Sequence, residues 1–293
     1  QGELYVVGGV ESMSRVPILS DRGPLFTDPD VSSKVPFIPN GVTADFIAAQ
    51  QGYSREELDA YAAASHNKAA LATEKGYFKR SLVPVKNELG DVLLSDDELI
   101  RPGSSIESMA RLNPSFEALG AQGSDELLCK SFPEVDHIPH HHHPGNSPGM
   151  VDGASLALLA TGEMAASLGL PVRAEIIGFS AKSAAAIEGL TGGYAAAKDV
   201  LERTGIAGED IDLWEFNEGF AATAMNFAKQ LDVPLDRYNV NGGGIAMGHA
   251  MGATGVNILG MMIDELERRK KHTGLIAISG AAGAGAAMVV RIH

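Results

Sequence analysis

The first residues that could do chemistry are Asn217-Glu218-Gly219-Phe220, where an expected strand gives way to an expected helix. At such a junction in an α/β protein, a side-chain amide can point into a ligand cleft. The simpler interpretation is that Asn217 caps the helix, as asparagine before a helix often does. Taken alone, these four residues favour the capping role.

A longer segment, residues 239–255, is more informative. Its three consecutive glycines, Gly242-Gly243-Gly244, let the backbone pass very close to a ligand or a neighbouring element. His249 is expected to open the next helix, whose N-terminus lowers the pKa of an imidazole and favours its neutral form. A buried structural histidine beside a glycine-packed helix explains either half of the segment, but packing alone does not explain the whole.

A third segment, residues 274–285, ends an apolar strand in small residues. Small residues at the end of a strand can expose backbone N–H groups to a developing oxyanion. A tight β-hairpin accounts for the same residues equally well.

The composition is that of an ordinary globular protein, and it argues against several functions. The net charge of −14 disfavours a general nucleic-acid or anionic-membrane surface, either of which would need a basic face. No apolar run reaches the length of a membrane span. The single cysteine, Cys129, excludes a disulfide framework and favours a cytoplasmic or organelle-matrix location. The run of four histidines at 140–143 lacks the companion ligands of a dedicated metal site, so no metal is expected.

The elements that must position these segments alternate from residue 174 onward. Strands are expected over 174–180, 212–216, 238–240, 275–279 and 286–292, and helices over 194–204, 219–231 and 249–268. Gly205 is expected to end the first of these helices. The alternation favours a mainly parallel sheet covered by helices on both faces.

The N-terminal part follows a different pattern. Residues 4–7 are typical of a buried strand and residues 8–14 of the loop after it; because no turn or cap comes first, a fragment is expected. Prolines and short helices from 17 to about 143 indicate an inserted α-rich subdomain. Its best-marked helix follows a capping box formed by Ser54 and Glu57.

Together with residues 8–14 (Gly-Gly-Val-Glu-Ser-Met-Ser) and 145–154 (Gly-Asn-Ser-Pro-Gly-Met-Val-Asp-Gly-Ala), the three segments stand in the order typical of thiolases. The chain resembles the degradative acyl-CoA acyltransferases and the acetyl-CoA acetyltransferases of that family along essentially its whole length. Residues 242–255 are the most specific part of the resemblance.

The resemblance implies an α/β protein with the thiolase fold. In that fold two similar halves pack in five αβαβα layers with mixed sheets, and an inserted α-rich loop domain binds coenzyme A. The first half is expected to be incomplete here. Residues 1–17 and 145–168 would be its remnant, residues 18–144 the loop domain, and residues 169–293 the C-terminal half.

The resemblance also implies an oxyanion hole. Asn217 would hold a water molecule that forms this hole together with His249. Fixed donors are useful there because breaking a thioester or forming a C–C bond places negative charge on a carbonyl oxygen.

Further positions are implied to contact the substrate. Phe220 would line the pantetheine tunnel, and Arg101 and Ser108 would contact the nucleotide end of coenzyme A. Gly248 and Ala281 complete the expected contacts. A surface ion pair is the simpler interpretation of Arg101.

Both catalytic cysteines of the family pattern are missing from this sequence. The nucleophilic cysteine is expected upstream of residues 8–14, and Cys129 is expected to be a structural or incidental thiol. The second cysteine, which moves protons at the α-carbon and the leaving group, falls on Ser279. A serine hydroxyl has no comparable access to its anion, so it is a poor substitute base. Pro148 and Ala250 also replace a pantetheine-contacting serine and the proline that follows the motif histidine.

Two functions are consistent with these features. One is an acyl-CoA thiolase of fatty acid metabolism and β-oxidation, which cleaves 3-ketoacyl-CoA thiolytically or runs the reverse Claisen condensation of acetyl-CoA units. Coenzyme A would be a substrate, with no resident cofactor. The alternative, which Ser279 favours, is a catalytically impaired thiolase-like protein or partner subunit that binds coenzyme A thioesters. A thiolase-fold lyase that uses His249 without covalent catalysis ranks last.

The same resemblance bears on assembly. A homodimer or homotetramer is expected, because the family usually assembles through a shared sheet edge. An uncovered apolar sheet edge would otherwise favour a complementing subunit.

Overall fold

The computed structural model describes residues 2–32 and 34–293. Its C-terminal part forms a four-stranded sheet. The strand order is β5 (Glu175–Ser183), β8 (Ala284–Arg291), β7 (Thr273–Ser279) and β6 (Leu213–Phe216). β6 and β7 are parallel, whereas β8 runs antiparallel to both of its neighbours.

The expectation of a mainly parallel sheet is therefore wrong. The physical reason is the short connection between β7 and β8, at residues 280–283. Two strands joined by so short a turn must run antiparallel, since a parallel pair needs a crossover of a dozen residues or more. The hairpin interpretation of residues 274–285 is confirmed.

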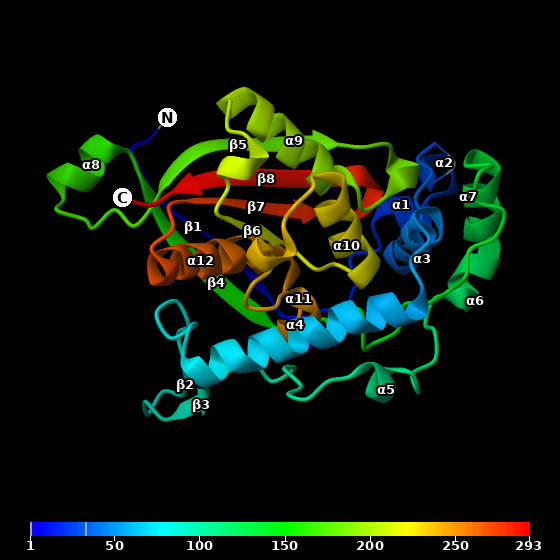
Figure 1. Ribbon diagram of the computed structural model, residues 1–293, viewed down its shortest axis with the longest axis horizontal. Coiled ribbons are helices and arrows are strands. Elements are labelled where there is room, and N and C mark those ends of the chain that lie inside the picture. Colours follow the sequence, from blue (N-terminus) through cyan, green and yellow to red (C-terminus); the bar gives the residue numbers. More distant parts are fainter. Residues whose placement is uncertain (1, 33) are drawn as a thin grey trace.

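Helices cover both faces of this sheet (Figure 1). α9 (Gly192–Thr204) and α10 (Ala221–Gln230) pack on one face, and α12 (Met251–Arg269) packs on the other. Side chains alternate between the faces of a strand. Trp214 and Phe216 of β6 accordingly enter the α9/α10 side, while Leu213 enters the α12 side. Gly205 ends α9 as expected.

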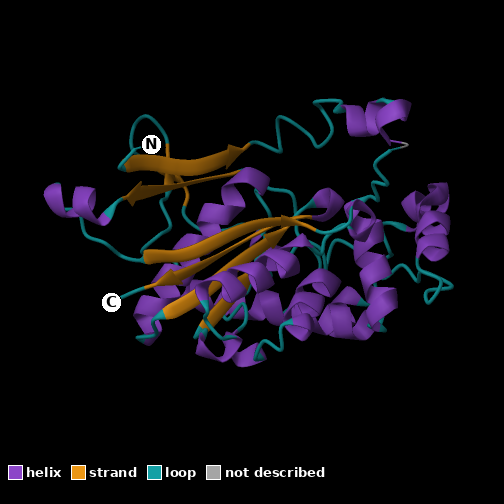
Figure 2. Cartoon of the chain, turned by 90° about the horizontal axis from the view of Figure 1, so that it is seen from above, coloured by secondary structure: helices purple, strands orange, loops and turns teal. Residues whose placement is uncertain are grey.

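A second sheet lies beyond α12 (Figure 2). It consists of β1 (Leu4–Glu11) paired antiparallel with β4 (Gly153–Ala160). The Ser155 hydroxyl donates to the carbonyl oxygen of Ala253 in α12 at 2.7 Å, which fixes this face against the helix. The described chain therefore stacks as α, β, α and β layers.

β1 differs from its expectation in two ways. It continues to Glu11 instead of ending near residue 7, because residues 8–11 pair in register with residues 153–156. Its outer face is not buried. Val6 is 72% exposed and Val10 74%, and Leu156 beside them on β4 is 77% exposed.

The α-rich region lies between these two strands in sequence. Its elements are α1 (Pro24–Thr27), α2 (Pro29–Ser32), α3 (Asn40–Gln51), α4 (Arg55–Lys75), α5 (Ile106–Met109), α6 (Glu117–Leu119), α7 (Asp125–Ser131), β2 (Val85–Lys86) and β3 (Val92–Leu94). The remaining short helices are α8 (Gly162–Ser167) and α11 (Gly244–Met247). None of the helices among the described residues combines the length and apolarity that crossing a membrane requires. The domain boundaries given above remain predictions.

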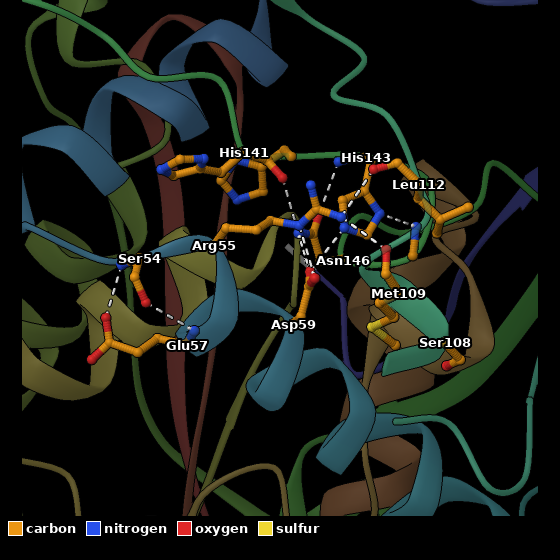
Figure 3. A network of polar contacts seen from close by, with 12 residues as sticks. Ser54, Arg55, Glu57, Asp59, Ser108, Met109, Leu112, His141, His143 and Asn146 are labelled. Atoms are coloured by element: carbon orange, nitrogen blue, oxygen red, sulfur yellow. Dashed lines mark hydrogen bonds and ion pairs between the residues drawn. The ribbon is translucent and has the colours of Figure 1, made fainter. Parts of the chain in front are cut away.

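The long helix α4 begins with the expected capping box, which is confirmed (Figure 3). The Ser54 hydroxyl oxygen accepts from the Glu57 amide at 3.2 Å, and the Ser54 amide donates to the Glu57 carboxylate at 2.8 Å. We expect Ser54→Ala to lower the free energy of unfolding by about 1 kcal/mol, because a backbone N–H loses its acceptor. Urea denaturation measures this loss. Ser54→Asp, which keeps a capping oxygen, is the control and should stay near wild type; equal losses in both variants would contradict the capping role.

Candidate functional site

The three glycine- and polar-rich segments meet at the carboxyl ends of β6 and β7. Asn217 directly follows β6, and Ser279 is the last residue of β7. Because β6 and β7 are parallel, their carboxyl ends lie at the same edge of the sheet, where α/β proteins commonly bind ligands. His249 reaches Asn217 from the segment before α12: its Nε2 lies 3.5 Å from Asn217 Nδ2.

Asn217 is positioned for a role other than capping. The N-cap residue of α10 is Phe220, so the capping interpretation of Asn217 is wrong. The Asn217 side chain is 3% exposed, and its Oδ1 is buried without a hydrogen-bond partner among the described residues. Buried polar atoms normally have partners, so this amide is suited to hold a water molecule or a polar substrate atom. A half-turn of the Asn217 amide exchanges Nδ2 and Oδ1, so that Oδ1 faces His249 instead of Nδ2.

His249 is held at both its backbone and its ring. Its amide donates to the Gly149 carbonyl at 2.8 Å, and its Nδ1 lies 2.7 Å from the Thr254 hydroxyl oxygen. Burial lowers the pKa of His249, although the carboxylate of Glu11 acts in the opposite direction. The helix begins at Met251 with Ala250 as its N-cap, so the expectation that His249 opens this helix is wrong. Burial lowers the pKa in the expected direction and favours the neutral imidazole at pH 7.

The glycines before His249 allow close approach to protein rather than to a ligand. A Cβ on Gly242 would lie 2.4 Å from the carbonyl oxygen of Ser65 in α4. Gly248 has φ +89°, and a Cβ there would lie 2.5 Å from Val151. The segment is therefore wedged between α4 and the loop at 148–151.

The expected strand at 238–240 is absent from the described structure. Tyr238 forms only an isolated parallel bridge with Trp214. Asn239 has φ +41°, which breaks the extended backbone. The Asn239 side chain forms the hydrogen bonds to β6 that a neighbouring strand would form. Its Oδ1 accepts from the Phe216 amide at 2.9 Å, and its Nδ2 donates to the Phe216 carbonyl at 3.0 Å.

Glu218 is a structural centre of the site that sequence reasoning did not identify. Its buried carboxylate accepts from the Tyr61 hydroxyl at 2.9 Å and the Ser65 hydroxyl at 2.7 Å. The carboxylate also accepts from the Ile245 amide at 3.1 Å and from Asn239 Nδ2 at 3.2 Å. One carboxylate thus joins α4, the segment before His249 and the segment after β6. The only signal in the sequence is its place beside Asn217.

The loop that meets His249 is held by two buried carboxylates. Asp59 lies 2.8 Å from His143 Nε2, accepts from Asn146 Nδ2 at 2.9 Å and pairs with Arg55 at 2.8 Å (Figure 3). Arg55 also donates to the carbonyl oxygens of Met109 and Leu112, which links α4 to α5 and the residues that follow it.

Asp45 of α3 holds the other end of the histidine run. It contacts His142 Nδ1 at 2.7 Å and His140 Nδ1 at 2.8 Å. His142 Nε2 then accepts from the Ala222 amide at the start of α10. These histidines are structural groups, and no cluster of three or more potential metal ligands is found in residues 2–32 and 34–293.

Ser279 is half-buried at the end of β7. Its hydroxyl oxygen accepts from the Gly193 amide at the start of α9, at 2.9 Å. The exposed Ala281 lies in the turn that follows, where the Gly280 amide is already used by the Ala284 carbonyl at 2.7 Å. That N–H serves the hairpin and is not free for an oxyanion.

The expected coenzyme A contacts lie on the loop-domain side. Arg101 is exposed, and its guanidinium forms no ion pair with any residue that the structure describes. The Ser108 hydroxyl donates to the Ser105 carbonyl and accepts from the Ser105 amide, so it already caps α5. Phe220 packs edge-on against Phe116 and His142, with centroid distances of 5.8 and 5.5 Å. Their roles in binding remain predictions.

His66 gives this side of the molecule a pH-dependent stability. Its Nδ1 accepts from the Arg101 amide at 3.2 Å, and burial, with Arg101 nearby, lowers its pKa to about 4. Between pH 6.5 and about 4 only the unfolded chain binds this proton, so stability falls as the pH falls. We expect this group to remove about 3 kcal/mol from the free energy of unfolding across that window.

The measurement is urea unfolding at several pH values for wild type and His66→Asn, whose amide oxygen can still accept from Arg101. The difference between the two curves should change between pH 6.5 and 4 and be constant above pH 7. Parallel curves over the whole range would contradict the assignment to His66.

The layered α/β fold thus places a paired amide and imidazole at the carboxyl edge of its sheet. Comparison with known proteins shows the family. A family model described as "Thiolase, N-terminal domain" matches residues 1–124, and one described as "Thiolase, C-terminal domain" matches residues 170–292.

Individual relatives match over most of the chain. An acetyl-CoA acetyltransferase of Thiocystis violacea is 36% identical over 254 residues, covering 85% of this chain and 59% of that protein. A 3-ketoacyl-CoA thiolase of Aliivibrio fischeri is 35% identical over 296 residues, covering 98% of this chain and 70% of that protein. The crystal structure of the Bacillus anthracis acetyl-CoA acetyltransferase superposes with a TM-score of 0.82 at 30% identity, covering 100% of this chain and 72% of that one. The chain belongs to the thiolase family.

Proposed function

We propose that the protein is an acyl-CoA thiolase, an acyltransferase of the acetyl-CoA C-acyltransferase type. The observation that carries this proposal is the Asn217–His249 pair, 3.5 Å apart, with a buried amide oxygen that has no hydrogen-bond partner in residues 2–32 and 34–293. The printed names of the relatives, acetyl-CoA acetyltransferase and 3-ketoacyl-CoA thiolase, support the same chemistry.

The reaction breaks or forms a C–C bond next to a thioester. In the thiolytic direction, a cysteine thiolate would attack the 3-keto carbon and create an oxyanion. When this intermediate collapses, the C2–C3 bond breaks, the acyl group stays on the sulfur until coenzyme A takes it, and the acetyl-CoA carbanion takes a proton from the acid/base group. His249 is neutral, so it can donate one N–H to such an oxygen while Asn217 holds a water molecule as the second donor. Preorganised donors of this kind lower the barrier because they need no rearrangement when the charge develops.

Coenzyme A thioesters are the proposed substrates, and no resident cofactor is proposed. Because the chain carries a net charge of −14, a phosphorylated ligand needs a local cation. The exposed and unpaired guanidinium of Arg101 supports a role at the nucleotide end of the ligand.

Cys129 does not fit the role of the acylated nucleophile. It lies in α7 and packs on the cluster of Ile38, Phe46 and Leu128. Burial raises the pKa of its thiol, and the nearby carboxylates of Asp125 and Asp136 raise it further. A thiol with a raised pKa is a poor nucleophile at neutral pH. Covalent catalysis would therefore use a cysteine other than Cys129.

Ser279 favours a second candidate. Its hydroxyl occupies the position proposed for the acid/base group, and it is not a competent base at neutral pH. The second candidate is a thiolase-like protein that binds coenzyme A thioesters, alone or as a partner subunit, with little or no turnover.

One pair of measurements tests both candidates. The protein is purified from its natural source and assayed with acetoacetyl-CoA plus coenzyme A, and binding of coenzyme A is measured by calorimetry. Thiolysis that produces two acetyl-CoA per acetoacetyl-CoA supports the first candidate. Binding without turnover supports the second, and the absence of both would reject both.

The cellular setting is part of the proposal. A role in fatty acid metabolism and β-oxidation, in the cytoplasm or an organelle matrix, fits a family whose relatives include peroxisomal 3-ketoacyl-CoA thiolase A of Rattus norvegicus. We also propose a homodimer or homotetramer, or a complementing subunit, since the outer face of β1 and β4 exposes Val6, Val10 and Leu156. Mass photometry of the natural protein tests the oligomer.

A further inference from the structure

Thr254 lies in the first turn of α12, and its side chain contacts the ring of His249. Its side chain is buried, at 4% exposure, and its hydroxyl oxygen is 2.7 Å from His249 Nδ1. In the part of the chain that the structure describes, this hydroxyl makes no other hydrogen bond. The imidazole is therefore its one partner.

A hydroxyl can donate or accept, and burial decides between the two cases here. If Nδ1 carried the proton, Thr254 would accept it, and its own O–H would remain buried without an acceptor. If Thr254 donates to a bare Nδ1, its own proton is paired and the ring proton is on Nε2. A half-turn of the Asn217 amide then brings Oδ1, which has no partner among the described residues, to the position from which Nδ2 faces Nε2, so that this N–H is paired as well. Leaving a buried donor unpaired is unfavourable, so donation by Thr254 is favoured.

We propose that Thr254 is a positioning residue, which donates to Nδ1 of His249 and thereby fixes the tautomer that carries its proton on Nε2. Nε2 is the nitrogen that faces Asn217, at 3.5 Å from its amide. The inference rests on the proposed function, because an N–H at Nε2 is what an oxyanion facing Asn217 requires. The opposite tautomer would present a lone pair to that oxyanion and repel it.

The backbone supports the same geometry. Thr254 and His249 are held on opposite sides of a tight turn, in which the Ala253 amide donates to the Ala250 carbonyl at 2.8 Å. The Gly252 amide is directed to the Glu11 carboxylate at 3.0 Å. Glu11 is a charged neighbour of the ring, but its carboxylate accepts from this amide, so Thr254 is the one hydrogen-bond partner of Nδ1 among the residues that the structure describes.

The experiment reads the tautomer directly by two-bond ¹H–¹⁵N correlation of the ¹⁵N-labelled protein at pH 8, where His249 is neutral. The His249 signals are assigned by their absence from His249→Gln. The wild type and Thr254→Ser, which keeps the hydroxyl, should both show a protonated Nε2 and a bare Nδ1. Thr254→Val, which has the same shape without the hydroxyl, should show a mixture of tautomers.

Kinetics supply the second readout. We expect Thr254→Val to lower kcat about tenfold with little change in KM, as loss of one hydrogen bond in the transition state would, and Thr254→Ser to restore it. A wild-type His249 protonated on Nδ1 would overturn the inference, as would a valine variant with unchanged tautomer and kcat. If the valine variant does not fold, the wild-type spectrum decides alone. A protein that shows the hydroxyl-dependent tautomer but no thiolysis would reject the proposed function and still support the assignment of Thr254.

Discussion

Replacing His249 with alanine is expected to lower kcat for thiolysis by about 10²–10³-fold, the usual effect of losing one oxyanion donor. KM should change much less, because the donor stabilises charge that develops only in the transition state. Asn217→Ala should have an effect of similar size, since it removes the second half of the same site. The measurement is steady-state kinetics with acetoacetyl-CoA and coenzyme A.

The double variant provides the sharper test. Because the two groups act on one oxygen, the loss in Asn217→Ala/His249→Ala should be smaller than the product of the single losses. His137→Ala is the matched control, because His137 is an exposed histidine far along the chain from this pair. Unchanged kinetics in both single variants would remove the site assignment.

The second large effect is expected from Ser279→Cys, which should raise the thiolysis rate by about 10²-fold. General acid–base groups commonly contribute about 10²–10⁴-fold, and a thiol can reach its anion near neutral pH whereas a serine hydroxyl cannot. The site is suited to a thiolate, because the Gly193 amide already donates to the Ser279 oxygen at 2.9 Å. That hydrogen bond favours the anion and lowers the pKa of a thiol placed there.

The pH profile of the rate distinguishes acid–base catalysis by the new thiol from an increase in activity with another cause. The cysteine variant should lose its added rate as the pH falls below the pKa of the new thiol, and alkylation should abolish the gain. Ser167→Cys, at an exposed serine in α8, is the control and should show neither effect. An unchanged rate in Ser279→Cys would mean that the acid/base group lies elsewhere.

Local features of the fold could be predicted because they depend on residues close in sequence. The capping box of Ser54 and Glu57 joins residues three apart, and Gly205 ends α9 through its own backbone conformation. The positions of β5, β6, β7 and β8 were recognisable for the same reason, since alternation and apolar runs are local patterns, whereas the strand expected at 238–240 is absent from the described structure. The order of the glycine- and polar-rich segments was sufficient to indicate the family.

Strand direction and side-chain roles depended on packing between distant segments. β8 runs antiparallel to β7 because of the short turn between them, but its pairing with the distant strand β5 is specified by no local pattern. Asn217 looked like a helix cap, but the helix starts later and the amide turns inward toward His249. No metal was expected at the histidine run, but its spacing gave no sign of its partners, the carboxylates of Asp45 in α3, Asp59 in α4 and Asp125 in α7.

The sequence alone determined which segments carry the chemistry, and in what order, because residue type and short-range spacing are written directly in it. Only the tertiary structure decided what each group contacts. His143 meets Asp59 across 84 residues, and Glu218 meets Ser65 across 153. Buried charges and hydrogen-bond donors require partners. Which residues become these partners depends on how whole helices and strands pack together. Thr254 lies only five residues from His249, but the sequence did not indicate their contact either. The hydrogen bond to Nδ1 depends on the turn between His249 and α12, which brings the two side chains together.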